Sequence, residues 1–550
     1  MRQFVLALSL LFSVLIHAQG YYATPDQNVY TLDPEMVGIV QGTVSDAVAL
    51  QNRKAINQAF QEAYEANYKI FAIDSLEAYF DIVTLTEGRS SFTPRLEAIR
   101  IPGPNITLKM SDDTHLRAQP NNAGEYELMT NNLHDNVTIT GGNLWGDRNQ
   151  HDYSGDGGGE HGHVLVIRGG ENCLVDGVVM KEGSGDGLDV KGLNFFYDAN
   201  YNETRNLVVR NCIIDSNRRN NISITDGYHI IIENNQILNA GVDTPTSQGT
   251  APQFGIDIEP YAEDNDAGVA FYYEHIEDIT IRNNIERGSV KGATIIVGGD
   301  TVMIENNNFE TGIGYKHANN VTIRNNLSEN HNPEYTDVSG IFAGPTREKY
   351  KGNEIYGNTV IGFKNGMTLV SNNHDVHDNT FRNFKTGLYL KGYLNNTDVY
   401  DNTFESSAAS SDAAFFYLLN ADSVSVRNNT FESSRFAFRM DQVESENLNF
   451  EGNTIVSPNY TANLRRTSGV NVFENTFNTG FEIDDSSDLL FEGNTLNSGN
   501  KDTFRFRNAQ SNDVKIIGNT INTTARVMRQ DIEPVNLIFE GNTVNGAPQE

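Results

Sequence analysis

A short sequence motif recurs along the chain. In it, β-branched or aromatic residues alternate with polar ones, and a pair of residues at a chain corner is followed by Thr and an apolar residue. The motif is clear at 399–404 (VYDNTF), 426–431 (VRNNTF) and 491–496 (FEGNTL). Alternation with a period of two predicts short strands that each bury one face. The second corner residue is asparagine at positions 235, 284, 307, 326, 358, 379, 402, 429, 453, 475, 494, 519 and 542.

The spacing of these asparagines predicts the fold. Eleven of the twelve gaps lie between 19 and 32 residues, and the gap of 49 is read as two periods plus an inserted loop. A period near 23 with short strands and a fixed corner is typical of a parallel β-solenoid. Asparagine at such a corner can adopt the left-handed conformation and hydrogen-bond its counterparts in neighbouring rungs. Leucine-rich repeats need a leucine lattice that is absent, and propeller blades need about 40 residues.

Residues 45–67 break the strand pattern and predict the cap of the solenoid. Their apolar positions recur at helical spacing, and Ser45 is placed to be the N-cap. We therefore divide the mature chain into 19–102, which holds this capping helix and the first strands, and 103–550, the single β-helix. At the other end the repeat continues to Val544, so either a homo-oligomer covers the last rung or that rung is polar.

The first residues predict export. Arg2 precedes an apolar run over 4–16, which is shorter than a membrane-spanning helix needs, so 1–18 is interpreted as a signal peptide cleaved near Ala18 and Gln19. No later stretch predicts a membrane span, and we expect a periplasmic protein. The two cysteines, Cys173 and Cys212, are expected to be small buried residues rather than a disulfide.

Composition narrows the partners. With 40 Lys and Arg against 72 Asp and Glu the net charge is −32, which argues against nucleic-acid binding. An anionic substrate therefore needs a local basic cluster that opposes the overall field.

Such a cluster is predicted in the irregular rungs between 145 and 261. Three phrases, GDGLDVK (185–191), NRRNNISI (217–224) and GIDIEP (255–260), align as copies of one strand. If their alternate apolar residues point inward, Asp189, Ser223 and Asp257 form one outward column. Lys191, Thr225 and Glu259 form the next column, and Arg218 and Arg219 lie in the turn before the strand.

The motif order GDR, His151, HGH (161–163), GDG (185–187), NRR (217–219) and GIDIEP (255–260) resembles the pectate-lyase-like parallel β-helix proteins of bacteria and phage. The resemblance covers roughly 45–259. It implies a right-handed, all-β helix and a carbohydrate ligand, and it leaves the reaction open because the family includes both lyases and hydrolases. The calcium-binding aspartates of true pectate lyases have no clear match here.

On this basis the leading hypothesis is β-elimination on an acidic, uronate-containing poly- or oligosaccharide, by a lyase or a dehydratase. Arg218 and Arg219 are predicted to neutralise the substrate carboxylate, and His163 or Lys191 to take the α-proton. Glu259 or a tyrosine is predicted to protonate the leaving oxygen. Further residues are predicted to bind substrate: Asp186, Asp189, Ser223, Tyr389 and Lys391.

Two alternatives remain. The first is an inverting glycoside hydrolase, since Asp257 and Glu259 are two residues apart on one strand and have roughly the separation that inversion requires. The second is a non-catalytic glycan-binding solenoid. His151, Glu160 and His161 match no standard zinc spacing, so no metal site is predicted. No cofactor is expected, with a bound Ca²⁺ as the alternative.

Overall fold

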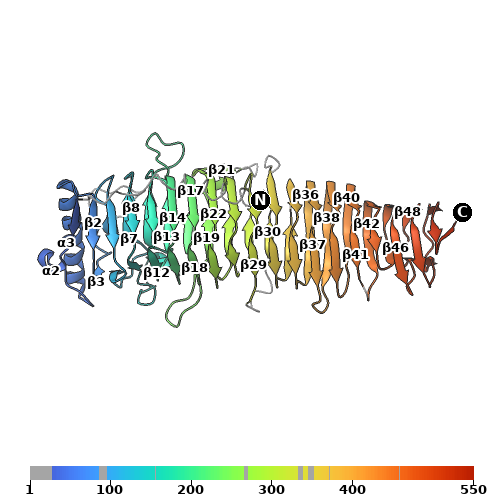
Figure 1. Ribbon diagram of the computed structural model, residues 1–550, viewed down its shortest axis with the longest axis horizontal. Coiled ribbons are helices and arrows are strands. Elements are labelled where there is room, and N and C mark those ends of the chain that lie inside the picture. Colours follow the sequence, from blue (N-terminus) through green and yellow to red (C-terminus); the bar gives the residue numbers. More distant parts are fainter. Residues whose placement is uncertain are drawn as a thin grey trace, which may run out of the picture.

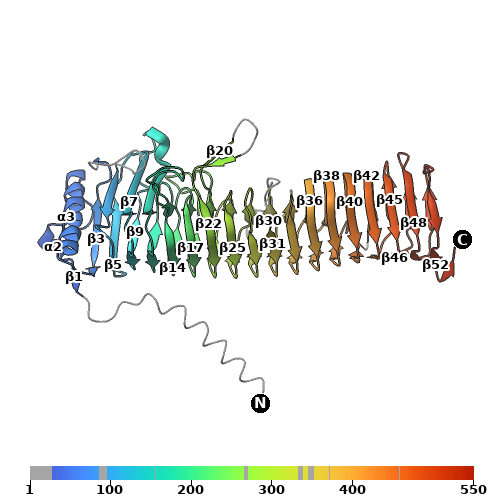
Figure 2. The same ribbon diagram turned by 90° about the horizontal axis from the view of Figure 1, so that it is seen from above.

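The computed structural model describes residues 28–85, 96–154, 156–264, 270–331, 339–344, 352–370, 372–457 and 459–549. They form one elongated solenoid, with helix α3 at one end and the last strands at the other (Figures 1 and 2). The predicted signal peptide lies outside the described residues. This architecture confirms the all-β, parallel β-helix prediction.

Each rung contributes strands to three rows that run the length of the body. The first row carries the site described below. Its strands are β4 (Glu97–Arg100), β7 (Glu125–Asn132), β10 (His161–Arg168), β13 (Leu188–Lys191), β16 (Ile222–Ile224), β19 (Phe254–Ile258), β24 (Gly292–Ile296), β27 (Ile313–Tyr315), β30 (Ser339–Ala343), β33 (Asn365–Leu369), β36 (Thr386–Tyr400), β38 (Asp412–Arg427), β40 (Arg439–Glu451), β42 (Ala462–Phe473), β44 (Phe481–Asp484), β47 (Phe504–Phe506) and β50 (Met528–Gln530).

The second row merges with the first in the long strands β36, β38, β40 and β42, each of which serves both rows. Its other strands are β1 (Val29–Thr31), β2 (Ile70–Ile73), β5 (Thr107–Met110), β8 (Thr138–Thr140), β11 (Leu174–Asp176), β14 (Arg205–Arg210), β17 (Gly227–Glu233), β22 (Ile276–Arg282), β25 (Asp300–Glu305), β28 (Thr322–Arg324), β31 (Asn353–Tyr356), β34 (His374–His377), β45 (Ser487–Glu492), β48 (Asn512–Ile517) and β51 (Ile538–Glu540).

The third row closes the rung and ends in a small hairpin. Its strands are β3 (Leu76–Phe80), β6 (Thr114–Ala118), β9 (Asn143–Trp145), β12 (Val179–Lys181), β15 (Ile213–Asp215), β18 (Gln236–Leu238), β23 (Ile285–Arg287), β26 (Asn308–Phe309), β29 (Leu327–Glu329), β32 (Thr359–Ile361), β35 (Thr380–Arg382), β37 (Thr403–Ser406), β39 (Thr430–Ser433), β41 (Thr454–Val456), β43 (Thr476–Phe477), β46 (Thr495–Gly499), β49 (Thr520–Thr523), β52 (Thr543–Val544) and β53 (Ala547–Pro548). The named strands pair in parallel, except for β52 with β53 and the hairpin of β20 (Ala262–Asp264) with β21 (Ala270–Tyr272).

The core is the column of inward side chains. Leu188, Ile222 and Ile256 occupy one register position in successive rungs and are fully buried. Farther along, Phe381 stacks on Phe404 with the rings 4.6 Å apart and nearly parallel. Like stacks on like because each rung repeats the same inward positions about 4.8 Å from the last.

The asparagines that mark the repeat form one continuous buried ladder. All thirteen are at most 2% exposed. Each side-chain amide nitrogen donates to the next asparagine's Oδ1, from Asn235 to Asn284 at 3.0 Å through to Asn519 and Asn542 at 3.0 Å. This confirms the predicted ladder but not the predicted backbone: the left-handed conformation belongs to the residue before the ladder asparagine, as at Asn234, where φ is 58°.

The gap of 49 residues is one rung, not two. Asn235 and Asn284 bond each other directly, and β17 pairs with β22, so no rung lies between them. The extra residues instead form loops that leave the rung, including the β20–β21 hairpin seen above the body in Figure 2. The sequence interpretation was wrong here because a spacing cannot distinguish a missing marker from a long insertion.

Helix α3 (Asp46–Glu65) closes the first rung, as predicted, and the short helix α2 (Pro34–Val37) precedes it. Ser45 is at the N-cap position, although its side chain makes no capping hydrogen bond. Ile56, Ala59 and Phe60 are buried in the core, and Phe60 stacks on Phe71 at 4.3 Å. Strands β2 and β3 already stack on β5 and β6, so the solenoid includes the rung beside the helix.

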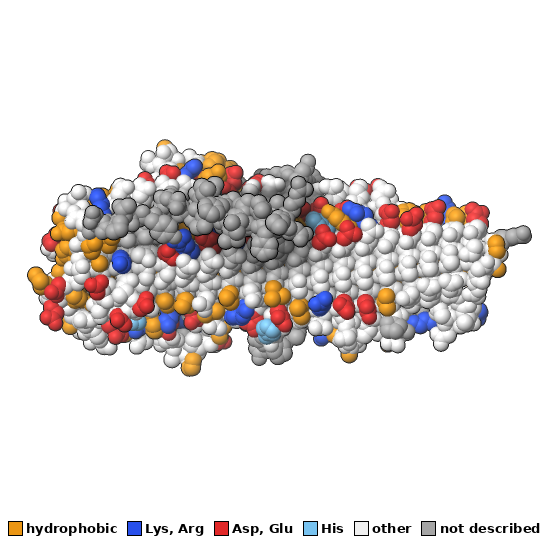
Figure 3. Space-filling model, viewed as in Figure 1, with side chains coloured by type: hydrophobic (Ala, Val, Ile, Leu, Met, Phe, Trp, Pro, Cys, Tyr) orange, Lys and Arg blue, Asp and Glu red, His pale blue; other side chains and the backbone are white. Residues whose placement is uncertain are grey.

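Both cysteines are free and buried, as predicted. Charged side chains follow lengthwise rows on the surface (Figure 3). Cross-rung ion pairs such as Arg427 with Asp398 at 2.7 Å stabilise these rows. Within the described residues no helix is long and apolar enough to cross a membrane.

Candidate functional site

The predicted outward column is present in the first row. Asp189 pairs with Ser223 and Ser223 with Asp257 in successive strands β13, β16 and β19. These three side chains leave the core, yet they are not open to solvent: they are 3%, 3% and 2% exposed. The residues that flank them, His163, Asp186 and Asn220, are buried as well. The site is therefore a buried polar cluster rather than the open polar face that the alternation alone suggested.

His163 lies between two of the aspartates. The backbone N–H of Asp186 donates to its Nδ1 at 3.2 Å, which leaves the proton of the neutral ring on Nε2. Nε2 lies 3.6 Å from Asp189 Oδ2. Burial lowers the pKa of His163, against the attraction of Asp189 and Asp186. The ring is thus neutral near pH 7, and neither nitrogen is a free base.

Asp186 is the most fully bonded carboxylate of the cluster. Its Oδ2 accepts from Arg219 Nη1 at 2.9 Å and from Ser223 Oγ at 3.0 Å, and its Oδ1 accepts from the backbone N–H of Asn220 at 2.9 Å. These donors fix the position of the carboxylate. Burial lowers the pKa of Arg219, but Asp186, Asp257 and Asp189 outweigh burial and the net pKa is raised.

Asp257 has the opposite environment. Its Oδ2 accepts one hydrogen bond, from Asn220 Nδ2 at 3.0 Å, and its buried Oδ1 has no hydrogen-bond partner among the described residues. Burial and the negative charge of Glu259 raise its pKa to about 7 despite Arg219. Asp257 is therefore a proton donor at pH values where ordinary aspartates are ionised.

Asp189 contrasts with it two rungs away in the same column. Burial raises its pKa, but the ammonium of Lys191, which bonds its Oδ2, and His163 outweigh burial and bring the pKa to about 2. Two carboxyl groups of one column are thus held in different protonation states, the condition for separate acid and base roles.

The spacing of Asp186 and Asp257 is limited by the groups between them. Asp186 Oδ2 contacts Ser223 Oγ at 3.0 Å, Ser223 Oγ contacts Asn220 Nδ2 at 3.1 Å, and Asn220 Nδ2 contacts Asp257 Oδ2 at 3.0 Å. Asp186 Oδ2 and Asp257 Oδ2 are therefore no more than about 9 Å apart, a bound that admits the roughly 6.5–9.5 Å of inverting pairs as well as the roughly 5–5.5 Å of retaining ones.

The two neighbouring arginines differ in what they do. Arg219 reaches the cluster and lies 4.0 Å from Glu160 at its edge. Arg218 turns the other way: its guanidinium donates to the backbone carbonyls of Gln248 and Gly158 and lies 4.1 Å from the centre of the Tyr153 ring. The structure thus places Arg219, and not Arg218, at the predicted site.

The other predicted residues lie farther out. Lys191 and Glu259 follow the buried column toward solvent, and Glu259 is exposed. Tyr389 occupies the register position of Asp257 five rungs along, about 24 Å away. Its ring stacks on Phe415 at 5.6 Å, and Lys391 Nζ lies 5.5 Å from its centre. These two residues do not belong to the buried cluster.

Several site residues were not predicted. Glu127 occupies the position next to His163 in the preceding strand and is ion-paired with buried Arg168, while Glu97 accepts from Thr130 at 3.1 Å. They continue the acidic column toward the cap. Arg168 could have been found from the sequence, because it ends an apolar strand as Lys191 does. Glu97 and Glu127 could not have been found in this way, because they precede the regular repeat.

The histidines considered for a metal have other partners. His151 Nδ1 is 2.8 Å from Asp147 Oδ2, and Tyr126 donates to the other oxygen of the same carboxylate. The His161 ring lies 6.1 Å from that of His163. No group of three or more metal-ligating side chains occurs in the part of the chain that the structure describes.

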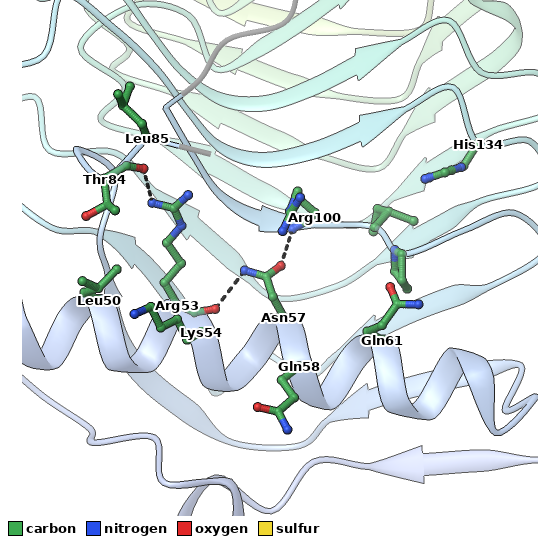
Figure 4. Close-up of a pocket in the computed structure, with 12 residues that line it drawn as sticks. Leu50, Arg53, Lys54, Asn57, Gln58, Gln61, Thr84, Leu85, Arg100 and His134 are labelled. Carbon is green, nitrogen blue, oxygen red and sulfur yellow. Dashed lines mark hydrogen bonds between the residues drawn. The ribbon is translucent and has the colours of Figure 1, made fainter. Parts of the chain in front are cut away.

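A hollow of about 560 Å³ lies away from this cluster, between α3 and the first rungs (Figure 4). Asn57 donates to the Ala98 carbonyl at 2.7 Å and accepts from the Arg100 backbone at 2.9 Å, and Arg53 donates to the Thr84 carbonyl at 2.6 Å. These bonds fasten the capping helix to the solenoid, so we assign this hollow a structural role.

Comparison with known proteins supports the fold. The family model described as "Right handed beta helix region" matches residues 128–309 and 267–431, which is more than half of the chain. Two Bacillus subtilis (strain 168) proteins are similar in sequence: the uncharacterized protein YclG, 29% identical over 306 residues, and the SPbeta prophage-derived uncharacterized protein YorA, 26% identical over 344 residues. The matches cover 54% and 61% of this chain and 50% and 56% of theirs, so the chain spans about half the length of these relatives.

Among solved structures, the Dettilon tailspike protein aligns with 90% of this chain and 72% of its own, at 15% identity and a TM-score of 0.41. At that score the similarity carries no argument about function.

Proposed function

We propose that this chain, which belongs to the right-handed β-helix family, is a glycoside hydrolase that cleaves its substrate at the Asp257 cluster with inversion. The observation that carries the proposal is a buried aspartic acid with an unpartnered oxygen, no more than about 9 Å from the oxygen of a second aspartate to which Arg219, Ser223 and Asn220 donate hydrogen bonds. Inverting hydrolysis uses two such carboxyl groups, one as the general acid and one as the general base.

The roles follow from these environments. Asp257 donates a proton from Oδ1 to the leaving glycosidic oxygen, and Asp186 accepts a proton from the attacking water on the opposite side of the sugar. Arg219 donates to Asp186 Oδ2 and holds the carboxylate in position. Asp257 and Glu259 were the pair considered from the sequence; Asp186 replaces Glu259 here because Glu259 is exposed and acts on Asp257 mainly through its charge.

Two observations weigh against β-elimination on a uronate, the leading sequence hypothesis. Of the two arginines expected to receive the substrate carboxylate, Arg219 is already paired with Asp186, and Arg218 donates to loop carbonyls. Of the two expected bases, Lys191 is paired with Asp189, and each nitrogen of His163 faces a group of an aspartate. The chain carries a net charge of −32, which repels an acidic saccharide. We therefore propose a neutral saccharide as the substrate.

The experiment offers the protein a panel of neutral and uronate-containing polysaccharides. Reducing ends are measured together with ultraviolet absorbance, and the anomer of the first product is followed by NMR. Hydrolysis with inversion gives new reducing ends, no unsaturated chromophore and the opposite anomer. An absorbing unsaturated product would establish elimination, and cleavage of no polymer in the panel would refute the proposal.

Variants locate the chemistry. Asp257→Asn and Asp186→Asn are each expected to lower kcat by a factor of about 10² or more, by analogy with the loss of a general acid or base. Asp398→Asn is the matched control, since Asp398 is paired with Arg427 on the same solenoid but outside the cluster.

Export and a homo-oligomer stay predictions. Sequencing the N-terminus of the native protein tests the predicted signal-peptide cleavage near Ala18 and Gln19.

A further inference from the structure

Two loops rise from the ends of the strands that carry the cluster. One follows β13, the strand of Asp189, and spans 192–204; the other follows β19, the strand of Asp257, and includes the β20–β21 hairpin (Figure 2). They are joined to each other, because the backbone N–H of Phe196 donates to the Tyr273 carbonyl at 2.7 Å and that of Tyr273 to the Tyr261 carbonyl at 2.9 Å.

Six aromatic side chains from these loops form one layer, which we call the aromatic platform: Phe195, Phe196, Tyr197, Tyr261, Phe271 and Tyr273. Tyr197 stacks on Phe271 with centroids 4.7 Å apart and an interplanar angle of 21°, and Phe195 stacks on Tyr261 at 5.8 Å. Despite these contacts the platform faces solvent: Phe196, Tyr197, Tyr261 and Phe271 are 47%, 59%, 46% and 45% exposed.

Two carboxyl groups, half-buried Glu274 and buried Asp226, anchor the platform to the end of β16, the strand between the two loops. Glu274 accepts from Thr225 at 3.1 Å and from the backbone N–H of Tyr261 at 2.7 Å. Asp226, which follows Thr225 in the chain, accepts from the Tyr201 hydroxyl and from the backbone N–H of His275, each at 2.9 Å. The rings are thus preorganised on the rung of Ser223 rather than carried on free loops.

The chemistry of the platform indicates what it binds. Large exposed aromatic surface that is held in place marks a binding site, because its burial is favourable only when a ligand covers it. Glu263 accepts from the hydroxyls of Tyr261 at 2.6 Å and Tyr273 at 3.0 Å, so a carboxylate lies at the edge of the rings. Flat apolar faces beside a hydroxyl acceptor match a sugar ring, and the carboxylate disfavours an anionic one.

We propose that the aromatic platform binds neutral sugar units of the same saccharide that is cleaved at Asp257, an inference that rests on the proposed function. Tyr261 is four residues from Asp257, a span of at most about 14 Å, so the two positions serve adjacent units of one chain. The saccharide then lies along the strand direction, across the solenoid axis. This differs from a groove along the axis toward Tyr389 and Lys391.

The test measures binding and cleavage separately with the full-length protein. Affinity electrophoresis in gels containing a neutral glucan, mannan, xylan or galactan, with polygalacturonate as the anionic arm, is run for the wild type and for Tyr197→Ala, Phe271→Ala and the double variant. Tyr460→Ala, which removes a tyrosine that is 47% exposed outside the platform, is the matched control. Circular dichroism confirms that every variant is folded.

We expect at least one neutral polymer to retard the wild type and the control, and each platform variant to weaken that binding about five- to tenfold. Equal retardation of the wild type and the double variant, or retardation by polygalacturonate alone, would overturn the inference. So would a concentration-dependent dimer that the double variant abolishes without any neutral polymer binding, because a second copy would then be the occupant.

The two proposals fail in different ways. Platform-dependent binding without cleavage of any polymer would refute hydrolysis and leave a sugar-binding platform. Cleavage that is unchanged in KM and in polymer binding for the double variant would refute the platform and leave the hydrolase.

Discussion

Replacing Glu259 by Gln should move the alkaline limb of the pH–activity profile to lower pH. In the proposed mechanism Asp257 must be protonated, so kcat/KM falls as pH rises through its pKa of about 7. After burial, the charge of Glu259 is the largest contribution that raises this pKa. Removing that charge makes Asp257 easier to ionise, and the fall in activity begins at lower pH.

The size of the shift follows from the geometry. Alternate residues of a strand are about 7 Å apart, and two unit charges at that distance interact by about 2.4 kcal/mol at an effective dielectric constant of about 20 or about 0.6 kcal/mol at about 80. At 1.36 kcal/mol per pKa unit these limits are about 1.7 and 0.4 units. Because Glu259 is exposed, solvent screening reduces its effect, and we expect about 0.5–1 unit.

The assay is the release of reducing ends from pH 4 to 9 at constant ionic strength, fitted for the alkaline limb. Glu432→Gln is the control, because it removes an exposed carboxylate far from the cluster and should leave the limb in place. Raising the salt concentration should shrink the difference between the wild type and Glu259→Gln. An alkaline limb that stays in place in Glu259→Gln, or moves to higher pH, would refute the assignment of Asp257 as the acid.

Three further outcomes test other parts of the structure. The pKa of Asp257 in the folded protein is raised above its unfolded value, so the wild type loses stability as pH rises from about 4 to about 7. Asp257→Asn does not ionise and should therefore melt at a higher temperature than the wild type above pH 7, with the difference shrinking toward pH 4. Arg219→Ala should lower kcat by about 10² or more with little change in KM, whereas Arg218→Ala should chiefly lower the melting temperature, since Arg218 bonds loop carbonyls. Asn379→Ala should lower the free energy of unfolding by about 3 kcal/mol, because it leaves buried partners in two rungs unsatisfied, while the exposed Asn522→Ala changes it little in the same denaturation experiment.

The regular part of this fold was predictable because two periods coincide in the sequence. The two-residue alternation sets which side chains enter the core, and the asparagine at each corner fixes the register between rungs. For that reason the column of Asp189, Ser223 and Asp257 could be placed correctly from three phrases of the sequence. The capping helix at α3 was equally accessible, since its apolar spacing changes from two to that of a helix.

The predictions that failed concern side-chain directions and burial, which depend on tertiary contacts rather than on the sequence pattern. Arg218 and Arg219 are adjacent and chemically identical, and only the conformation of the turn sends one to Asp186 and the other to Gln248 and Gly158. Exposure was misjudged for the same reason: alternation says that Asp257 leaves the core, not that neighbouring side chains then cover it.

The position of the site within the solenoid has a physical reason. Rungs contact only their neighbours, so a loop inserted between two strands leaves the stacking on either side intact and adds only a slowly growing entropic penalty. The asparagine ladder runs without interruption from Asn235 to Asn542, while the cluster and the loops of the aromatic platform lie around the first ladder rungs and the rungs before them. The ladder supplies a continuous stack, and beside its first asparagines a carboxyl such as Asp257 is buried at a cost in stability that the stack offsets.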